Sequence, residues 1–448
     1  MASAAERLDY VIKNFLLVYH CDSNPDWQIN YNCAVENGVL VPDFSGNYFK
    51  DRINFDAILV KWIDYKDEKI PLLFAAESNN LPFLATKGKV KFEFDIVSAI
   101  FFFLAGWQET VMKTKDTLER FTYQDSIQKR LNISSLPVVN YYFLMLKEAL
   151  ELAFKTQFVN KINAQNSFNA IISHDVDIWK NLWQKELKYA IKNTQILKAI
   201  QLIISYLDNN YYKKSFQKIE ALQLKYNFDS TYFFLPDTEK YEGFDSADYE
   251  IEKPAYKFFI RLLAQKNEIG LHGGFNSSEN IDKMQQDKKA IDAVFPVDIN
   301  RFHFLMFSQK TTLTILKKSS IKIDSTLGFN DLPGFRNSTS FPFYLFDYEQ
   351  NTASEVIEMP LIIMDATLFY SHYLHCQSKE AAWQMIEPIL KHLQKSGGNL
   401  VINWHNDAFA GLGREIWVDT FEQILAYCHS NNTRFCSFEQ VYKKLHGI

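Results

Sequence analysis

Residues 168–177 read FNAIISHDVD and indicate the fold class of the C-terminal part of this 448-residue chain. The apolar run FNAIIS predicts a short buried strand, which ends on His174 and on the carboxylates Asp175 and Asp177. A long segment with helical periodicity follows. A strand that ends on polar side chains and passes into a helix is typical of a parallel βαβ unit.

The same alternation continues to the end of the chain. Strands are predicted at residues 230–235, 268–272, 300–305, 321–326, 356–363 and 399–405, and helices at 254–266, 279–294, 309–318 and 378–395. Ser378 is a suitable N-cap for the last of these helices, and Gly397 would end it. About seven or eight such units predict a β/α barrel, irregular and seven-stranded, over residues 168–448.

Residues 1–160 are expected to form a smaller α/β domain of unknown role. Strand-like runs occupy residues 56–63 and 70–76, a buried helix is predicted at 94–106, and a longer helix at 138–158. No motif with an obvious chemistry occurs in this part. We therefore expect an α/β protein of two domains, divided between residues 160 and 168.

Composition limits the classes of partner. Apolar residues make up 47% of the chain and charged residues 23%, as in ordinary globular proteins. The net charge is −5 and no basic block occurs, so a nucleic-acid partner is not expected. Aromatic residues reach 15%; they fill cores, and some could line a carbohydrate groove.

The expected location is the cytoplasm. The five cysteines are scattered, odd in number and without a C-x-x-C pair, which is typical of a reduced chain. The first residues include Glu6 and Asp9 and show no signal-peptide pattern. The most apolar run, residues 96–107, is shorter than the roughly 20 residues that cross a bilayer, so no transmembrane segment is predicted.

Ionisable side chains recur where predicted strands end. In barrels these carboxyl ends form one rim, where functional side chains gather. The residues in question are Asp175, Asp177, His272, Arg301, Asp324 and His405.

Four of these residues are candidates for the chemistry, although each also has a structural alternative. Asp175 and Asp177 share one face of an extended strand, and a cation or proton would relieve their repulsion; the alternative is a pair of capping or turn residues. His272 and His405 each follow an apolar strand, where a histidine can be a ligand, an acid or simply a hydrogen-bonded residue.

Five ordered motifs carry a resemblance to a known family. They are SHDVD (173–177), EIGLHGGFNSS (268–278), NRFHFLMF (300–307), DSTLGFNDLPGFR (324–336) and LVINWHN (400–406). In this order they resemble the motifs of the polysaccharide deacetylases (carbohydrate esterase family 4, with a NodB-homology domain). The chain most resembles the bacterial branch in which a variable N-terminal domain precedes the barrel.

The resemblance implies a metal-dependent hydrolase acting on C–N bonds other than peptide bonds. Its reaction would remove N-acetyl (or O-acetyl) groups from a carbohydrate, in surface-polysaccharide metabolism. The implied cofactor is a divalent metal, zinc before cobalt or nickel. The implied roles are these: Asp175 is the general base, oriented by Arg301; Asp177 and His272 bind the metal; His405 is the general acid, tuned by Asp324.

Two departures from the family pattern bear on activity. Asn276 stands where the family has a second metal histidine, and an amide oxygen is a poorer zinc ligand than imidazole. His303 replaces the proline of the third motif. A catalytically impaired carbohydrate-binding protein therefore stays an alternative, as does a metal-dependent amidase on a small non-sugar substrate.

Three further residues are candidates for substrate contact. Trp404 and Phe304 are either walls of a sugar groove or core aromatics. Arg336 either meets a substrate anion or is an ordinary exposed arginine. The spacing of His372 and His375 is metal-like, but a solvated loop is the simpler interpretation because no second cluster accompanies it.

Overall fold

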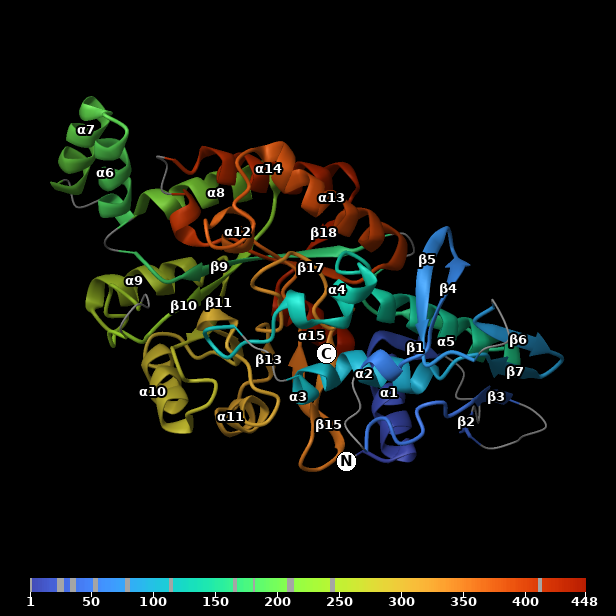
Figure 1. The fold of residues 1–448 in the computed structure, drawn as a ribbon. Coiled ribbons are helices and arrows are strands. Elements are labelled where there is room, and N and C mark those ends of the chain that lie inside the picture. The colour runs from blue at the N-terminus through green and yellow to red at the C-terminus, as the bar shows by residue number, and fades with distance from the viewer. Residues whose placement is uncertain are drawn as a thin grey trace.

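The computed structural model describes most of the chain. The described residues are 2–21, 28–32, 38–50, 55–76, 81–112, 116–163, 167–179, 182–207, 213–241, 246–409 and 413–448. Figure 1 shows the sheet of the C-terminal part with helices around it, and the N-terminal part packed beside it.

A ten-stranded sheet organises the C-terminal part. Its path runs β14-β15-β13-β12-β11-β10-β9-β17-β16, with β18 also paired to β9. All of these pairings are parallel except that of β14 with β15. The strands are β9 (Asn169–Val176), β10 (Ser230–Phe234), β11 (Glu268–Gly273), β12 (Ile299–Phe302), β13 (Ile323–Asp324), β14 (Phe343–Asp347), β15 (Thr352–Glu358), β16 (Ile363–Met364), β17 (Asn399–Asn403) and β18 (Arg434–Phe435).

Helices connect the strands as the βαβ interpretation predicts. Ser378 accepts a hydrogen bond from the Ala381 N–H at the start of α13, and Gly397 with φ 76° ends that helix, which confirms both caps. The helices are α6 (Leu182–Lys192), α7 (Ile196–Leu207), α8 (Lys214–Tyr226), α9 (Pro254–Leu263), α10 (Ile281–Asp292), α11 (Thr312–Lys318), α12 (Asp365–Phe369), α13 (Lys379–Ser396), α14 (Glu415–Ser430) and α15 (Phe438–His446).

The predicted α/β class is confirmed, but the sheet does not close into a barrel through strand pairing of the described residues. β13 and β16 are only two residues long, and antiparallel β14 occupies the outer edge of β15. The chain between β13 and β14 bonds instead to the N-terminal part. Phe335 N–H donates to Ser134 O at 2.8 Å, and Val139 N–H donates to Ser338 O at 2.9 Å.

The N-terminal part has its own small sheets and helices. One sheet runs β2-β3-β7-β6, and β4-β5 and β1-β8 are separate pairs. Helix α2 (Ile96–Leu104) is buried along its whole length, as its apolar sequence predicts. The other elements are α1 (Ala4–Val18), β1 (Tyr19–Cys21), β2 (Ile29–Tyr31), β3 (Gly38–Val41), β4 (Val60–Tyr65), β5 (Glu68–Leu73), β6 (Phe83–Thr86), β7 (Lys89–Phe92), α3 (Trp107–Val111), α4 (Ile127–Leu131), α5 (Val138–Phe154) and β8 (Phe158–Asn160).

The two parts share one hydrophobic core. Buried side chains of α1, α2 and α5 join those of the ten-stranded sheet in a single cluster. Tyr10 donates from its hydroxyl to the carbonyl of Tyr344 at 2.8 Å. Among the described residues, no strand before residue 161 pairs with the ten-stranded sheet, and a division at 160–168 stays our proposal. Of the helices described, none has the length and apolar character to cross a membrane.

Candidate metal and catalytic site

The carboxyl ends of β9, β11 and β12 and the residues just after β12 and β17 meet at one cavity. Its volume is about 380 Å³. The residues around it are Thr117, Leu118, Arg120, Asp175, Asp177, His272, Phe302, His303, Phe304, Leu305, Met364, Ala366, Tyr370, His372, Tyr373 and His405. The predicted rim therefore brings Asp175, Asp177, His272 and His405 together.

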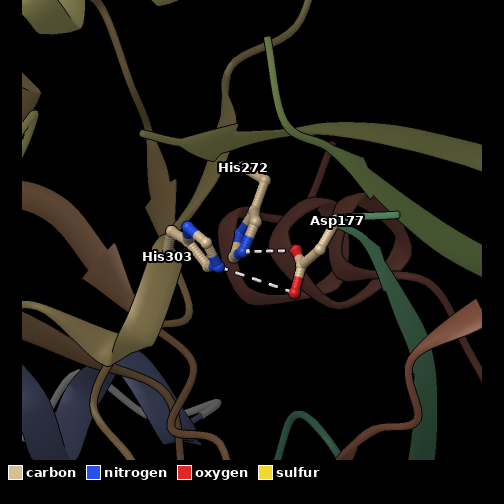
Figure 2. Close-up of side chains that lie close together, drawn as sticks. All are labelled: Asp177, His272 and His303. Carbon is tan, nitrogen blue, oxygen red and sulfur yellow. Dashed lines mark ion pairs between the residues drawn. The ribbon is translucent and has the colours of Figure 1, made fainter. Parts of the chain in front are cut away.

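Three of these side chains form a cluster suited to a metal ion. One ligand atom each from Asp177, His272 and His303 lies within 4.8 Å of the others. Nε2 of His272 is 3.3 Å from Oδ1 of Asp177, and Nε2 of His303 is 3.5 Å from Oδ2 of Asp177 (Figure 2). Burial alone would raise the pKa of Asp177, but the nearby rings of His303 and His272 hold it well below its usual range.

The donor set fits a divalent transition metal. Among the described residues, neither Oδ1 of Asp177 nor Nε2 of His272 has a hydrogen-bond partner, although both are buried. Nδ1 of His272 is 2.8 Å from the carbonyl of Arg301, which can only accept, so Nδ1 carries the proton and the Nε2 lone pair is available. Two imidazoles and one carboxylate with a remaining open position are typical of zinc and related ions.

Gly273 permits this close approach of β11 and β12. A Cβ at this position would lie 2.6 Å from the ring of Phe302, closer than atoms can pack. The glycine after His272 is therefore needed for strand packing next to the cluster, in addition to any role in ligand access.

Asp175 is held as a carboxylate by two fixed donors. Nη1 of Arg301 lies 2.8 Å from its Oδ1, and Nδ2 of Asn403 lies 2.7 Å from its Oδ2. Burial works to raise the pKa of Asp175, but the charges of Arg301 and of the nearby histidines lower it overall. The guanidinium of Arg301 is fully buried and also donates to Ser173 and Ser325, so it cannot turn away. The expected contact of Arg301 with Asp175 is present.

His405 is paired with Asp365. Its Nδ1 lies 2.6 Å from Oδ1 of Asp365, and its backbone N–H donates to Oδ2 at 2.9 Å. Burial opposes protonation of the ring, but Asp365, followed by Asp177 and Asp175, raises the pKa of His405 to about 10. The free Nε2 is 3.7 Å from Oδ2 of Asp177, facing the metal cluster.

Asp365, and not Asp324, is therefore the carboxylate that contacts His405. Asp324 accepts hydrogen bonds from Asn300 at 2.7 Å and from Thr326 at 3.0 Å, and its pKa is raised by burial. Asp324 pairs with Glu358 of the neighbouring strand β15, and it is not among the residues around the cavity. Asp365 directly follows β16, so the strand-end rule that selected the other residues would also have selected it.

His303 joins the cluster because the chain turns sharply after β12. Phe304 and Leu305 have φ values of 58° and 55°, a left-handed conformation that is uncommon for residues with a side chain. The rings of His303 and Phe304 stack at 3.8 Å, and both residues lie at the cavity. His303, which replaces the proline of the third motif, is thus a candidate metal ligand.

The N-terminal part supplies one wall of the cavity and fixes this turn. Nη1 of Arg120 lies 2.7 Å from the carbonyl of Phe304, and Nη2 lies 3.1 Å from the Tyr373 hydroxyl. Asp116 holds the guanidinium from the other side through its Oδ2, 2.8 Å from Nε. Nothing in the local sequence distinguished Arg120, because the two residues that it contacts at the cavity, Phe304 and Tyr373, are far along the chain.

Asn276 does not lie where a metal ligand would have to be. Its side chain is exposed, its φ is 67°, and it is not among the described residues around the cavity. The left-handed turn after Phe275 directs the chain into α10, and the side chain is carried to the surface. His303 supplies the second imidazole instead.

Trp404 and Arg336 are also placed differently from the expectation that they contact substrate. Trp404 is fully buried, with its ring 5.2 Å from that of Phe421. Arg336 is buried, and its Nε and Nη2 each lie 2.8 Å from the carboxylate of Glu109. Both are core residues, and Arg336 joins the two parts of the chain. Of the other histidine pair, His372 borders the cavity and His375 contacts Gln377.

Comparison with known proteins gives limited matches. Residues 4–155 match a family of unknown function (DUF7033). No curated protein matches the chain.

Solved structures similar to the chain include several deacetylases, all at low identity. A Mycobacterium smegmatis protein assigned as a polysaccharide deacetylase is 14% identical, covers 63% of this chain and 91% of its own, and has a TM-score of 0.43. PuuE allantoinase is 10% identical with the same coverage and a TM-score of 0.42. The peptidoglycan N-acetylglucosamine deacetylase Bc1960 is 13% identical, covers 62% of this chain and 90% of its own, and has a TM-score of 0.31.

Proposed function

We propose that this chain is a metal-dependent hydrolase that removes an acetyl group from nitrogen, or from oxygen, on a carbohydrate. The observation that carries the proposal is the cluster of Asp177, His272 and His303, with two buried ligand atoms that have no hydrogen-bond partner among the described residues. Asp175 and His405, the proposed base and acid, border the same cavity, as hydrolysis of an amide or ester requires.

In this proposal Asp177, His272 and His303 hold the metal, which is zinc or alternatively cobalt or nickel. When bound, such an ion polarises the acetyl carbonyl and lowers the pKa of water. Asp175 accepts the proton from the attacking water, and Arg301 and Asn403 fix the direction of its carboxylate. The turn after β12 places Phe304 along the wall as a flat surface for the substrate.

His405 is the proposed general acid. Its Nδ1 is engaged with Asp365, which leaves the Nε2 proton to be donated to the leaving amine or alcohol. Asp365 thus takes the positioning role that the resemblance assigned to Asp324. A carboxylate behind a catalytic imidazole fixes its tautomer and favours its cationic form.

A metal-dependent amidase on a small non-sugar substrate is the second candidate. The cavity of about 380 Å³ is at the small end of ligand sites, and residues 117–120 border it from the N-terminal part. Both features favour a small ligand or a chain end over the interior of a long polymer. The alternative of a catalytically impaired carbohydrate-binding protein rested on Asn276 in place of a second metal histidine, and the position of His303 in the cluster speaks against it. The cytoplasmic location stays a prediction.

Acetate release tests both candidates. The zinc-loaded protein would be incubated with N-acetylated and O-acetylated mono- and oligosaccharides and, separately, with small acetamides that contain no sugar. We expect acetate from at least one saccharide and none from the Asp175→Asn variant. Release only from the non-sugar acetamides would favour the amidase, and release from neither set would contradict the hydrolase proposal.

A further inference from the structure

Helices α6 and α7 form a hairpin with a small core of its own. Ala190, Ala199 and Leu202 are buried between the two helices, in a cluster separate from the main core. Figure 1 shows the hairpin projecting from the body of the protein beyond the end of β9. Its base is anchored, because the Trp179 ring is fully buried and its backbone N–H donates to Asp248 at 2.8 Å.

The outer face of the hairpin is aliphatic and exposed. Six large aliphatic side chains on it are between 45% and 79% exposed. Those in α7 recur at the spacing of one helical face, opposite the residues that pack on α6. Monomeric soluble proteins rarely expose such a continuous apolar stripe. The six residues are Ile191, Ile196, Leu197, Ile200, Ile203 and Ile204.

The charge of the hairpin is opposite to that of the whole chain. Lys188, Lys192 and Lys198 are exposed on it, whereas Glu186 is buried. Among the described side chains of α6 and α7, no carboxylate is exposed. The complete chain has a net charge of −5. The hairpin is therefore a local basic, apolar feature on an acidic protein.

We propose that the α6–α7 hairpin docks on the surface of an anionic membrane. Aliphatic side chains beside lysines are typical of helices that lie in the interface, with the apolar face in the acyl boundary and the ammonium groups at lipid phosphates. A protein partner fits less well, because interfaces between proteins are depleted in lysine and enriched in aromatic anchors.

Docking here would bring the cavity to the membrane surface. Asp177, at the carboxyl end of β9, is separated from the start of α6 only by the anchored Trp179 and its neighbours. The hairpin therefore leaves the same rim that holds the metal cluster. Resting on the function proposed above, this position favours an acetylated sugar that is attached to a lipid.

Vesicle binding tests the docking independently of catalysis. The full chain would be sedimented with vesicles of phosphatidylcholine alone, and with vesicles of equal parts phosphatidylcholine and phosphatidylglycerol. We expect binding to the anionic vesicles that weakens with salt. The Ile196→Gln/Leu197→Gln/Ile200→Gln and the Lys188→Glu/Lys192→Glu/Lys198→Glu variants should each bind at least ~10-fold more weakly.

Matched controls change equally exposed residues elsewhere. The Leu81→Gln/Leu152→Gln/Val159→Gln and the Lys69→Glu/Lys87→Glu/Lys391→Glu variants should bind as the wild type does. Circular dichroism checks that each variant folds. The proposal would be overturned if the wild-type protein did not bind anionic vesicles. It would also be overturned if a hairpin variant bound them as tightly as the wild type does.

Light scattering tests whether the hairpin face binds a second copy of the chain instead of a membrane. A dimer that the Ile196→Gln/Leu197→Gln/Ile200→Gln variant abolishes, without vesicle binding, would make this face an interface between copies and would also overturn the proposal. An Asp177→Ala variant that loses metal but still binds vesicles would separate docking from the proposed function.

Discussion

Nδ1 of His405 lies 2.6 Å from Oδ1 of Asp365, and the other carboxylate oxygen accepts the backbone N–H of the same histidine at 2.9 Å. These two contacts fix both the ring and the chain that carries it. The pair is built from two neighbouring parallel strands, β16 and β17, each of which ends just before one partner.

Replacing Asp365 should impair catalysis without removing the metal. For Asp365→Asn we expect kcat to fall by about 10²- to 10⁴-fold, because the imidazole loses the charge that keeps its proton available. Zinc content should not change. Asp324→Asn is the matched control, since Asp324 is equally buried but contacts Asn300 and Thr326 and not His405. A large loss of kcat in Asp324→Asn with none in Asp365→Asn would restore the role that the resemblance implied.

Arg120 should control metal affinity from the N-terminal part. Arg120→Met removes the donor to the Phe304 carbonyl, and the left-handed turn that presents His303 loses its support. We expect zinc affinity, measured by competition with a chelator, to fall by about 10- to 100-fold, as for other residues that orient metal ligands. Arg130→Met, at an exposed arginine paired with Asp56, should bind zinc normally. Equal affinity in both variants would show that the turn keeps its shape without Arg120.

Arg336 should contribute to stability and not to substrate binding. Its pair with Glu109 is buried on both sides, so Arg336→Met leaves an unpaired buried carboxylate and should lower the free energy of unfolding by about 3–5 kcal/mol. Unfolding in urea measures this loss. KM should be unchanged at a temperature where the variant is folded. A raised KM with unchanged stability would instead place Arg336 at the substrate.

His174 should make stability depend on pH. Burial of the His174 ring lowers its pKa to about 4 from the usual 6.5, against the opposing effect of the hydrogen bond from Nδ1 to the Trp404 carbonyl at 2.6 Å. The unfolded chain then takes up a proton first, so stability is lost as the pH falls from about 6.5 toward 4, by at most about 1.4 kcal/mol per pH unit.

Urea unfolding at pH 7 and pH 5 measures this dependence. His174→Gln should reduce the difference between the two values, and His429→Gln, at an exposed histidine, should leave it as in the wild type. An equal difference in the wild type and in His174→Gln would assign the pH dependence to other groups.

The sequence predicted the strand ends well and side-chain direction less well. Apolar runs that end on Asp175, His272 and His405 placed these residues on one rim, because parallel strands end at the same edge. Adjacent residues of an extended chain face opposite sides, so a cavity-facing His405 already implies a buried Trp404.

Other features depended on contacts between distant parts of the chain. His303 reaches the cluster through a left-handed turn that Arg120 holds from 184 positions away in the sequence. Phe335 and Ser338, in the chain between β13 and β14, bond to the N-terminal part. Local periodicity predicts neither of these long-range contacts. Only the folded structure shows them.

Zinc stoichiometry tests the central claim, that Asp177, His272 and His303 form the metal site, most directly. Elemental analysis after zinc loading and gel filtration would compare the wild type with His303→Ala and Asn276→Ala. We expect about one zinc per chain in the wild type and in Asn276→Ala, and a loss of zinc in His303→Ala. Zinc retained in His303→Ala but lost in Asn276→Ala, or absent from the wild type, would contradict the account.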